Sequence, residues 1–259
     1  MNQYLKNLKK IEFVVTDACT GHCKHCSQGE HTDCRCSIDP VVAADMVKKV
    51  AALYPIETVM TFGGEPLLSP EAVFAIHQAA SEMNIPRRQV ITNGYFTRDL
   101  QRMREVAKML AAAGVNDLLL SVDAFHQETI PEETVAQFAR ALLQAGVPVR
   151  TQPAWLVSAE DDNPYNRITR EILARFAELG ISANDGNVVF PEGSAKIHFA
   201  EYFGDSVPEN PYIEDPFDLY CLSVDADGSL LGMNLHDRDV IGIMEAYRGE
   251  QNGKKGGEV

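Results

Sequence analysis

The sequence predicts an α/β fold built on a parallel sheet with helices outside it. Segments rich in β-branched and other apolar residues alternate with helical segments along most of the 259 residues. Three joints read alike: A-A-G-V at 112–115, Q-A-G-V at 144–147 and E-L-G-I at 178–181. Each ends a helix, places a glycine where a left-handed cap fits, and opens a strand with a β-branched residue. Because crossovers between parallel strands are right-handed, the six units found here form a barrel or an open doubly wound sheet.

The individual elements follow from apolar runs and capping residues. The expected strands cover 11–15, 58–61, 89–92, 117–122, 147–152 and 187–189. The expected helices cover 40–53, 70–83, 97–114, 131–146 and 166–180. Asp39, Ser69 and Thr97 are the expected N-caps of the first three helices, and a proline suited to the first turn follows Asp39 and Ser69.

The last part of the chain differs from this repeat. We expect a barrel domain over 1–192, an irregular extension over 193–248 and a flexible tail over 249–259. The proline- and aromatic-rich stretch 193–218 is an expected lid over the barrel mouth. A hairpin is predicted from Leu219–Val224 and Leu230–Met233, turned by Asp225–Gly228.

Charge and hydropathy argue against two classes of partner. The formal net charge is −14, whereas nucleic-acid-binding surfaces are usually basic. No apolar stretch approaches the ~20 residues that span a bilayer. The polar segment 1–10 has no apolar signal-peptide core. We therefore expect a cytoplasmic protein that binds neither nucleic acid nor membrane.

Three cysteines directly follow the first expected strand, in the run C-T-G-H-C-K-H-C. Cys19, Cys23 and Cys26 can bind three irons of a four-iron cluster and leave the fourth iron open for a reacting ligand. Close spacing without a secretory signal indicates metal in a reducing cytosol. Zinc is the rival metal, with further ligands available from His22, His25, Cys34 and Cys36. An apolar helical stripe is the third reading, which Gly21 disfavours.

Polar residues and glycines follow the other strands where each strand ends. They are Gly63, Gly64, Glu65 and Pro66 after the second strand, Thr92 and Asn93 at the third, Ser121 and Asp123 at the fourth, Gln152 at the fifth, and Pro191 to Gly193 after the sixth. The carboxyl ends of barrel strands form one rim, which is the usual active-site face. His126 lies beside this rim, where an ordinary solvated histidine is the favoured interpretation over a substrate contact.

Together these motifs resemble the radical S-adenosylmethionine (radical SAM) enzymes. The resemblance rests on C-x3-C-x2-C after the first strand, G-G-E-P after the second and T-N-G after the third, and it spans 11–193. It implies a partial (βα)6 TIM-like barrel. It also implies that the three cysteines hold a [4Fe–4S] cluster, whose open iron binds the amine and carboxylate of S-adenosylmethionine. Reduction would then cleave the sulfonium bond, and a 5′-deoxyadenosyl radical would take hydrogen from a peptide or small molecule.

The resemblance also assigns roles at the rim. Gly63 and Gly64 would let main chain approach the methionyl end, Glu65 would accept from its ammonium, and Pro66 would fix the turn. The residues expected to bind S-adenosylmethionine are His25, Gly63, Gly64, Glu65, Pro66, Thr92, Asn93, Ser121, Asp123 and Gln152. An electron donor such as flavodoxin or ferredoxin is the implied protein partner.

The run from Cys221, C-L-S-V-D-A-D-G, is similar to the start of a SPASM or twitch extension, in which cysteines hold auxiliary clusters. The second cysteine of that pattern is missing, so we expect the hairpin without a cluster. Peptide modification is the activity that this likeness favours. Cys34 and Cys36 are either a thiol pair near the active site or ordinary loop cysteines, and the second interpretation is favoured.

Two other functions stay open. One is an activase that places a radical on a glycine of a partner protein. The other is a metal-binding regulator without catalysis.

Overall fold

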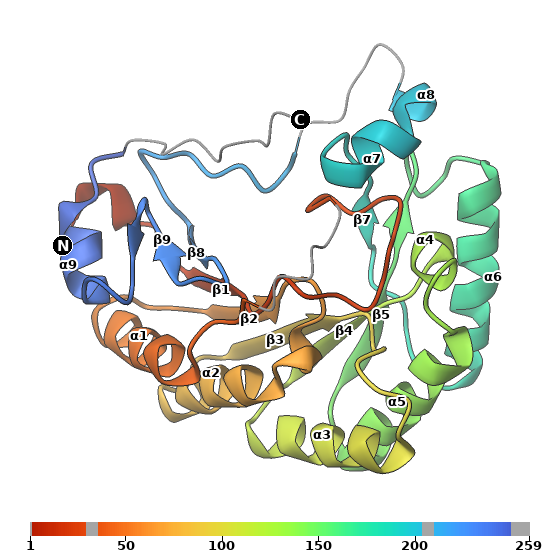
Figure 1. The fold of residues 1–259 in the computed structure, drawn as a ribbon, viewed down its shortest axis with the longest axis horizontal. Coiled ribbons are helices and arrows are strands. Elements are labelled where there is room, and N and C mark those ends of the chain that lie inside the picture. Colours follow the sequence, from red (N-terminus) through yellow and green to blue (C-terminus); the bar gives the residue numbers. More distant parts are fainter. Residues whose placement is uncertain (1, 30–35, 204–209, 250–259) are drawn as a thin grey trace.

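The computed structural model describes residues 2–29, 36–203 and 210–249. Its main sheet has six strands in the order β5-β4-β3-β2-β1-β8, and every neighbouring pair is parallel. The strands are β1 (Lys10–Val14), β2 (Thr58–Phe62), β3 (Arg87–Thr92), β4 (Asp117–Ser121), β5 (Val149–Gln152) and β8 (Cys221–Val224). Figure 1 shows the sheet curving inside a row of helices. The predicted α/β partial barrel is confirmed.

The outer helices are α1 (Pro40–Leu53), α2 (Pro70–Glu82), α3 (Leu100–Ala112), α5 (Glu132–Ala145) and α6 (Pro164–Glu178). Asp39 caps α1 as predicted, because its side chain accepts from the amides of Val41 and Val42. Ser69 is the N-cap of α2 as predicted, with Pro70 in the first turn, but its hydroxyl lies 2.7 Å from that of Ser37 and makes no cap hydrogen bond.

The prediction of Thr97 as the N-cap of the third helix is wrong, because α3 begins at Leu100. Asp99 is its N-cap and accepts from the amide of Gln101 at 2.8 Å. The Thr97 hydroxyl instead accepts from the Asp99 amide at 3.1 Å. The threonine therefore fixes the entry to the helix and leaves the helical amides to the carboxylate.

The sixth expected strand forms away from the main sheet. β7 (Asn187–Val188) pairs in parallel with β6 (Ala154–Trp155), which follows β5 after Pro153. A single bridge between Thr151 and Ala183 links the two segments closer to β5. The rim of the barrel thus extends past β5 through a short second sheet.

The predicted hairpin is wrong in its pairing. The turn is present, with the Gly228 amide donating to the Asp225 carbonyl at 2.9 Å. However, β8 pairs with the open edge of β1, while β9 (Ser229–Leu230) pairs with β10 (Met233–Asn234). The edge of β1 satisfies the backbone of β8 and lets the strand bury Leu222 and Val224 completely.

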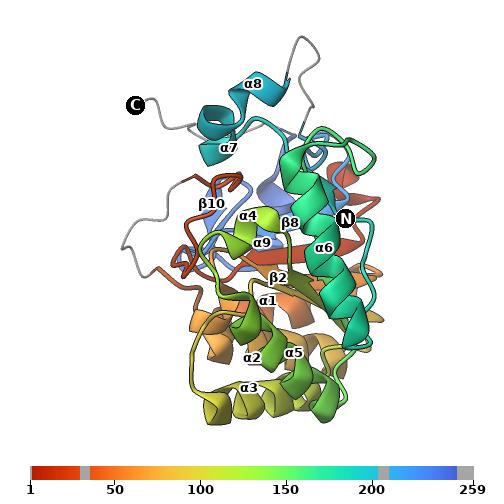
Figure 2. The same ribbon diagram turned by 90° about the vertical axis from the view of Figure 1, so that its right-hand side faces the viewer.

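The remaining elements are short. They are η1 (Gln3–Leu5), η2 (Pro66–Leu68), α4 (Ala124–Gln127), α7 (Gly193–His198), α8 (Ala200–Phe203) and α9 (Val240–Ala246). Figures 1 and 2 both show α7 and α8 together beyond α4, on the side of the barrel where the cysteine loop lies.

Strand residues alternate between two environments, as the pleat requires. The side chains that face the helices are apolar and fully buried, among them Ile11, Phe13, Val59, Val90 and Leu118. The alternate positions carry polar groups such as Glu12, Ser121 and Gln152, which are partly exposed. The interior of the barrel is therefore polar enough to receive a ligand.

Two predicted features concern residues that the structure does not describe. Cys34 lies outside the described residues, as does the expected flexible tail apart from Gly249. Within the described ranges, no helix combines the length and the apolar character needed to cross a membrane.

Candidate functional site

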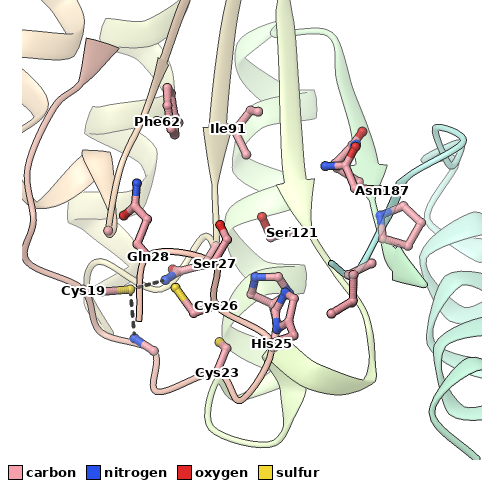
Figure 3. A pocket seen from close by; sticks show the side chains of 18 of the residues that line it. Cys19, Cys23, His25, Cys26, Ser27, Gln28, Phe62, Ile91, Ser121 and Asn187 are labelled. Carbon is pink, nitrogen blue, oxygen red and sulfur yellow. Dashed lines mark hydrogen bonds between the residues drawn. The ribbon is translucent and has the colours of Figure 1, made fainter. Parts of the chain in front are cut away.

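A pocket opens at the carboxyl ends of the strands, and most of the predicted site residues line it (Figure 3). They are Cys19, Cys23, His25, Cys26, Gly63, Gly64, Thr92, Asn93, Ser121 and Gln152. Three predicted residues are instead buried around it: Glu65, Pro66 and Asp123. The convergence at the rim that the sequence predicted is therefore present.

The three cysteines lie on one loop after β1, and Figure 3 shows their sulfur atoms at the same end of the pocket. No helix forms over 16–29, so the reading of the cysteines as a helical stripe is wrong. The amide of Gly21 donates to Cys19 Sγ at 3.3 Å, and Asn93 Nδ2 approaches the same sulfur at 3.6 Å. Hydrogen bonds of this kind stabilise negative charge on a metal-bound sulfur.

The spacing of the sulfurs tests which metal group the loop fits. Among the described residues, only His25, Asp123 and His126 bring three metal-binding atoms within 4.8 Å of one another. The three cysteine sulfurs are therefore spread more widely than that. A single tetrahedral zinc with 2.3 Å bonds would hold its sulfurs about 3.8 Å apart. At least one pair of the three sulfurs therefore lies farther apart than the sulfurs around a single zinc ion. Three cysteines at one end of the pocket are also the donor set that a four-iron cluster with one open iron requires.

Burial controls the protonation of these thiols. It raises the pKa of Cys19 to about 11 and also raises the pKa of Cys23 and of Cys26. Without metal the three groups are neutral at pH 7. Metal binding must therefore release their protons.

Two glycines bring the end of β2 against the cysteine loop. The Gly64 amide donates to the Thr16 carbonyl, and the Glu65 amide donates to the Ala18 carbonyl, both at 2.8 Å. A Cβ atom at Gly63 would lie 2.6 Å from the Thr16 oxygen, and one at Gly64 would lie 2.2 Å from the Ala18 oxygen. Only glycine fits at either position, because backbone occupies the space of a side chain. The G-G-E-P run thus positions the segment that leads into Cys19.

Glu65 connects the ends of β2 and β3 from a fully buried position. Its carboxyl accepts from the Thr92 hydroxyl at 2.7 Å, the Asn93 amide at 2.8 Å and the Leu67 amide at 2.9 Å. Burial raises the pKa of Glu65 to about 7, although these hydrogen bonds lower it. Pro66 opens η2 behind it. The carboxyl thereby fixes the strand ends that present Thr92 and Asn93 to the pocket.

Asp123 performs a similar task on the opposite wall, at the N-terminus of α4. It accepts from the amides of Phe125 and His126 at 2.9 Å, from the Ala154 amide at 3.0 Å and from His126 Nδ1 at 2.8 Å. Burial alone would raise the pKa of Asp123, but the charge and hydrogen bond of His126 lower it to about 2. The carboxylate is therefore ionised and fully bonded.

His25 lies between the cysteine loop and this wall. Its ring centroid is 4.9 Å from that of Phe125 and 4.6 Å from that of His126. Burial, followed by the charge of His126, lowers the pKa of His25 to about 3. The ring is thus neutral and can contact a ligand through its face. Nearby, Gln152 Oε1 accepts from Asn184 Nδ2 at 2.5 Å.

Sequence reasoning missed several residues that line the pocket. They are Phe62, Ile91, Pro153, Ala154, the segment 187–190 and Tyr212, and it left His126 as a solvated side chain. The D-A-F-H run held the signal for His126, because a histidine three residues after an N-cap aspartate lies over that carboxylate. Tyr212 lines the pocket from the C-terminal extension, where sequence analysis had singled out no contact residue.

The other two described cysteines do not line the pocket. Cys221 lies in β8, where burial raises its pKa, and the carbonyl of Cys36 accepts from the Thr16 hydroxyl at 2.7 Å. The likeness of the segment after Cys221 to a SPASM extension stays a prediction.

Comparison with known proteins agrees with this site. The model of the radical SAM superfamily matches residues 13–192. A probable GTP 3′,8-cyclase of Saccharolobus islandicus is 26% identical over 213 residues, covering 78% of this chain and 64% of that protein. The GTP 3′,8-cyclase of Moorella thermoacetica is 24% identical over 210 residues, covering 74% and 63%. The chain therefore spans about 64% of the length of the curated relatives it matches.

Solved structures resemble the fold over a larger share of the chain. Native anSMEcpe with bound AdoMet has a TM-score of 0.57 at 13% identity and covers 93% of this chain and 81% of that one. HydG, a maturase of the [FeFe]-hydrogenase, has a TM-score of 0.52 at 13% identity and covers 80% and 47%. The family model matches more than half of the chain, over the same strands and cysteines that form the pocket. The chain belongs to the radical SAM superfamily of enzymes, whose cofactors are a [4Fe–4S] cluster and S-adenosylmethionine.

Proposed function

We propose that the protein cleaves S-adenosylmethionine reductively and uses the product to abstract hydrogen from a peptide or a small molecule. When bound, the two cofactors supply one-electron cleavage of the sulfonium and a 5′-deoxyadenosyl radical. A cytoplasmic flavodoxin or ferredoxin is the proposed electron donor. The observation that carries the proposal is the set of three partly buried free cysteines at one end of a pocket, whose sulfurs do not all lie within 4.8 Å of one another.

The residues of the pocket divide this work. Cys19, Cys23 and Cys26 hold the metal, and Asn93 donates toward the first of these sulfurs. We assign S-adenosylmethionine to the lining formed by Gly63, Thr92 and Ser121, at the ends of the neighbouring strands β2, β3 and β4. His25 supplies a neutral ring surface suited to an adenine. Gln152 supplies a polar group at the end of β5, beside Ser121.

Glu65, Pro66 and Asp123 contribute from behind the wall. We propose that Glu65 and Asp123 act mainly by holding the backbone, because their oxygens already accept three and four hydrogen bonds respectively. Pro66 shapes the turn that keeps Glu65 in place. A direct contact of Glu65 with the methionyl ammonium would have to replace one of these hydrogen bonds.

Two substrate classes are proposed for assay. GTP is the small molecule in the names of the relatives at 24% and 26% identity. A peptide is the other, since anSMEcpe, which shares the fold, has been solved with AdoMet and the Cp18Cys peptide. The stretch 193–218 is the proposed lid, because Tyr212 within it lines the pocket.

The test is anaerobic reconstitution with iron and sulfide, followed by dithionite and S-adenosylmethionine. We expect a brown protein absorbing near ~400 nm that releases 5′-deoxyadenosine, measured by mass spectrometry. Cys26→Ser should abolish this release. Cys221→Ser, which changes a buried cysteine away from the pocket, is the matched control and should retain it.

Substrate class is read in the same assay. Addition of GTP or of a candidate peptide should increase 5′-deoxyadenosine and transfer deuterium from a labelled substrate into it. A colourless protein that binds zinc, or a brown one that leaves S-adenosylmethionine intact, would refute the proposed function.

A further inference from the structure

His126 is held by a carboxylate that cannot turn away from it. Its Nδ1 lies 2.8 Å from Asp123 Oδ2. The same oxygen accepts from the Ala154 amide, and Asp123 Oδ1 accepts from the amides of Phe125 and His126. Asp123 is completely buried. Four donors on two oxygens fill the accepting capacity of the carboxylate and fix its plane.

This arrangement selects one tautomer of the neutral imidazole. An ionised carboxylate only accepts hydrogen bonds, so the ring proton of His126 must be on Nδ1. The other nitrogen, Nε2, then carries a lone pair. Nε2 makes no hydrogen bond to any residue in the described ranges, although the side chain lines the pocket and is 17% exposed. An acceptor without a protein partner therefore borders the site.

A metal ion is the competing explanation for this group. One ligand atom each from His25, Asp123 and His126 lie within 4.8 Å of one another. However, a cation would have to displace a donor from Asp123, whose oxygens are already filled, and the proton from His126 Nδ1. The hydrogen bonds of Asp123 and His126 are those of an orienting pair.

We propose that His126 is a specificity-determining contact of the pocket, whose Nε2 accepts a hydrogen bond from an O–H or N–H group of the bound ligand. The inference rests on the proposed function. The donor belongs either to a ribose hydroxyl of S-adenosylmethionine or to the substrate. A ligand without a donor at this point would leave a desolvated acceptor unpaired, which is a strong basis for rejection. Asp123 is the positioning residue of the pair.

The tautomer is tested first, on the unmodified protein. Long-range ¹⁵N–¹H spectra of ¹⁵N-histidine-labelled protein should show His126 protonated at Nδ1 in its neutral form. Diethyl pyrocarbonate acylates only an unprotonated ring nitrogen, so mass mapping should find His126 modified at Nε2. A neutral ring protonated at Nε2, or a His126 inert to the reagent, would overturn the proposal without reference to cofactors.

Asp123→Asn tests the orienting role. An asparagine that keeps its oxygen on the α4 amides presents its NH₂ group to Nδ1, which must then accept and pass the proton to Nε2. Because the wild-type hydrogen bond involves a charged group, acylation of His126 should fall by about tenfold or more. His198→Gln changes a histidine in α7 that does not line the pocket, and acylation of His126 should be unchanged. An unchanged rate in Asp123→Asn would contradict the assignment.

Protection experiments on reconstituted protein show which ligand donates the hydrogen bond to His126 Nε2. If S-adenosylmethionine alone slows acylation of His126 about tenfold, the donor is on the cofactor. If it has no effect but S-adenosylmethionine with GTP protects, the donor is on the substrate. Protection by neither overturns the contact. Release of 5′-deoxyadenosine from the same sample shows separately whether the proposed function holds.

Discussion

Two buried carboxyl groups support the pocket, and their pKa values are shifted in opposite directions. Glu65, beside the cysteine loop, accepts from two amides and a hydroxyl, and its pKa is raised to about 7. Asp123, across the pocket, accepts from three amides and an imidazole, and its pKa is lowered to about 2. Both have no exposed surface. Because burial is the same in both, the opposite pKa shifts come from the partners, and the charge and hydrogen bond of His126 are the largest of those that lower the pKa of Asp123.

The different pKa shifts of Glu65 and Asp123 match the residues that lie beside each carboxyl group. The charge of Glu65 raises the pKa of Cys19, so a poorly ionised carboxyl there interferes less with a metal-bound thiolate. Asp123 faces His126, whose orientation depends on a permanent negative charge. Residues that the sequence marks as ligands can thus act by supporting the residues that touch the ligand.

The largest expected effect is loss of the cluster when a side chain is added at Gly64, where backbone packs against backbone. Gly64→Ala should abolish cluster incorporation, because the new Cβ would lie 2.2 Å from the Ala18 oxygen and push the cysteine loop away. Iron content after anaerobic reconstitution measures this. Gly180→Ala is the control: a Cβ there meets nothing within 4 Å. It should retain iron and cost only about 1–2 kcal/mol for its positive φ.

Removal of the charged carboxylate should cost more stability than any other single change in the two walls. Asp123→Ala leaves three buried amides and His126 without an acceptor, and we expect a loss of about 3–5 kcal/mol. Urea unfolding of the metal-free protein measures it. If Asp123→Ala lowers the free energy of unfolding by less than Glu65→Ala does, the hydrogen bond between His126 and Asp123 does not add to stability.

The two carboxyls should also respond oppositely to pH. A folded pKa above the unfolded value gives stability that is present below about pH 4.5 and lost as pH rises through about 7. For Glu65 this loss is on the order of 2 kcal/mol between pH 5 and pH 8. Asp123 adds nothing to the pH dependence between pH 5 and pH 8, because its stabilisation is constant there and is lost only as pH falls toward its folded pKa of about 2.

Urea unfolding of the metal-free protein at the two pH values checks this difference. Glu65→Gln should remove the Glu65 part of the pH dependence, because the amide does not titrate. An unchanged pH dependence in that variant would show that Glu65 does not titrate in this range.

The smallest effect concerns one hydroxyl on the Glu65 side. Thr92→Val removes the 2.7 Å hydrogen bond to Glu65 and the 3.0 Å hydrogen bond that the hydroxyl accepts from the Gly94 amide, and should cost about 1–2 kcal/mol. It should also raise the pKa of Glu65 further, since the bond to Glu65 favours the charged form. Thr58→Val in β2 changes a hydroxyl that has no hydrogen bond among the described residues, so its unfolding free energy should change less. Equal effects would mean that the Thr92 bonds add nothing.

The sequence predicted the barrel well because its signals are local. Glycine caps, N-cap residues and β-branched runs located five strands of the main sheet within a few residues. β8 was placed in a hairpin because its turn is real, while its partner, β1, is more than 200 residues away along the chain. Local patterns do not show such pairings.

The same limit applies to the site. The cysteine loop and the strand ends were predicted, because parallel strands bring their carboxyl ends to one rim. The depth of Glu65 and Asp123 was not, because burial depends on packing of whole elements. His126 was misjudged for the same reason, since its value comes from the carboxylate that orients it and from the wall that it lines.

The most direct test of the account counts iron and acid-labile sulfide in the anaerobically reconstituted protein. Two variants are compared with wild type: one with serine at Cys19, Cys23 and Cys26, and one with serine at Cys36 and Cys221. The account predicts about four irons and four sulfides per chain in wild type and in the second variant, and none in the first. A cluster retained by the first variant, or zinc without sulfide in wild type, would contradict it.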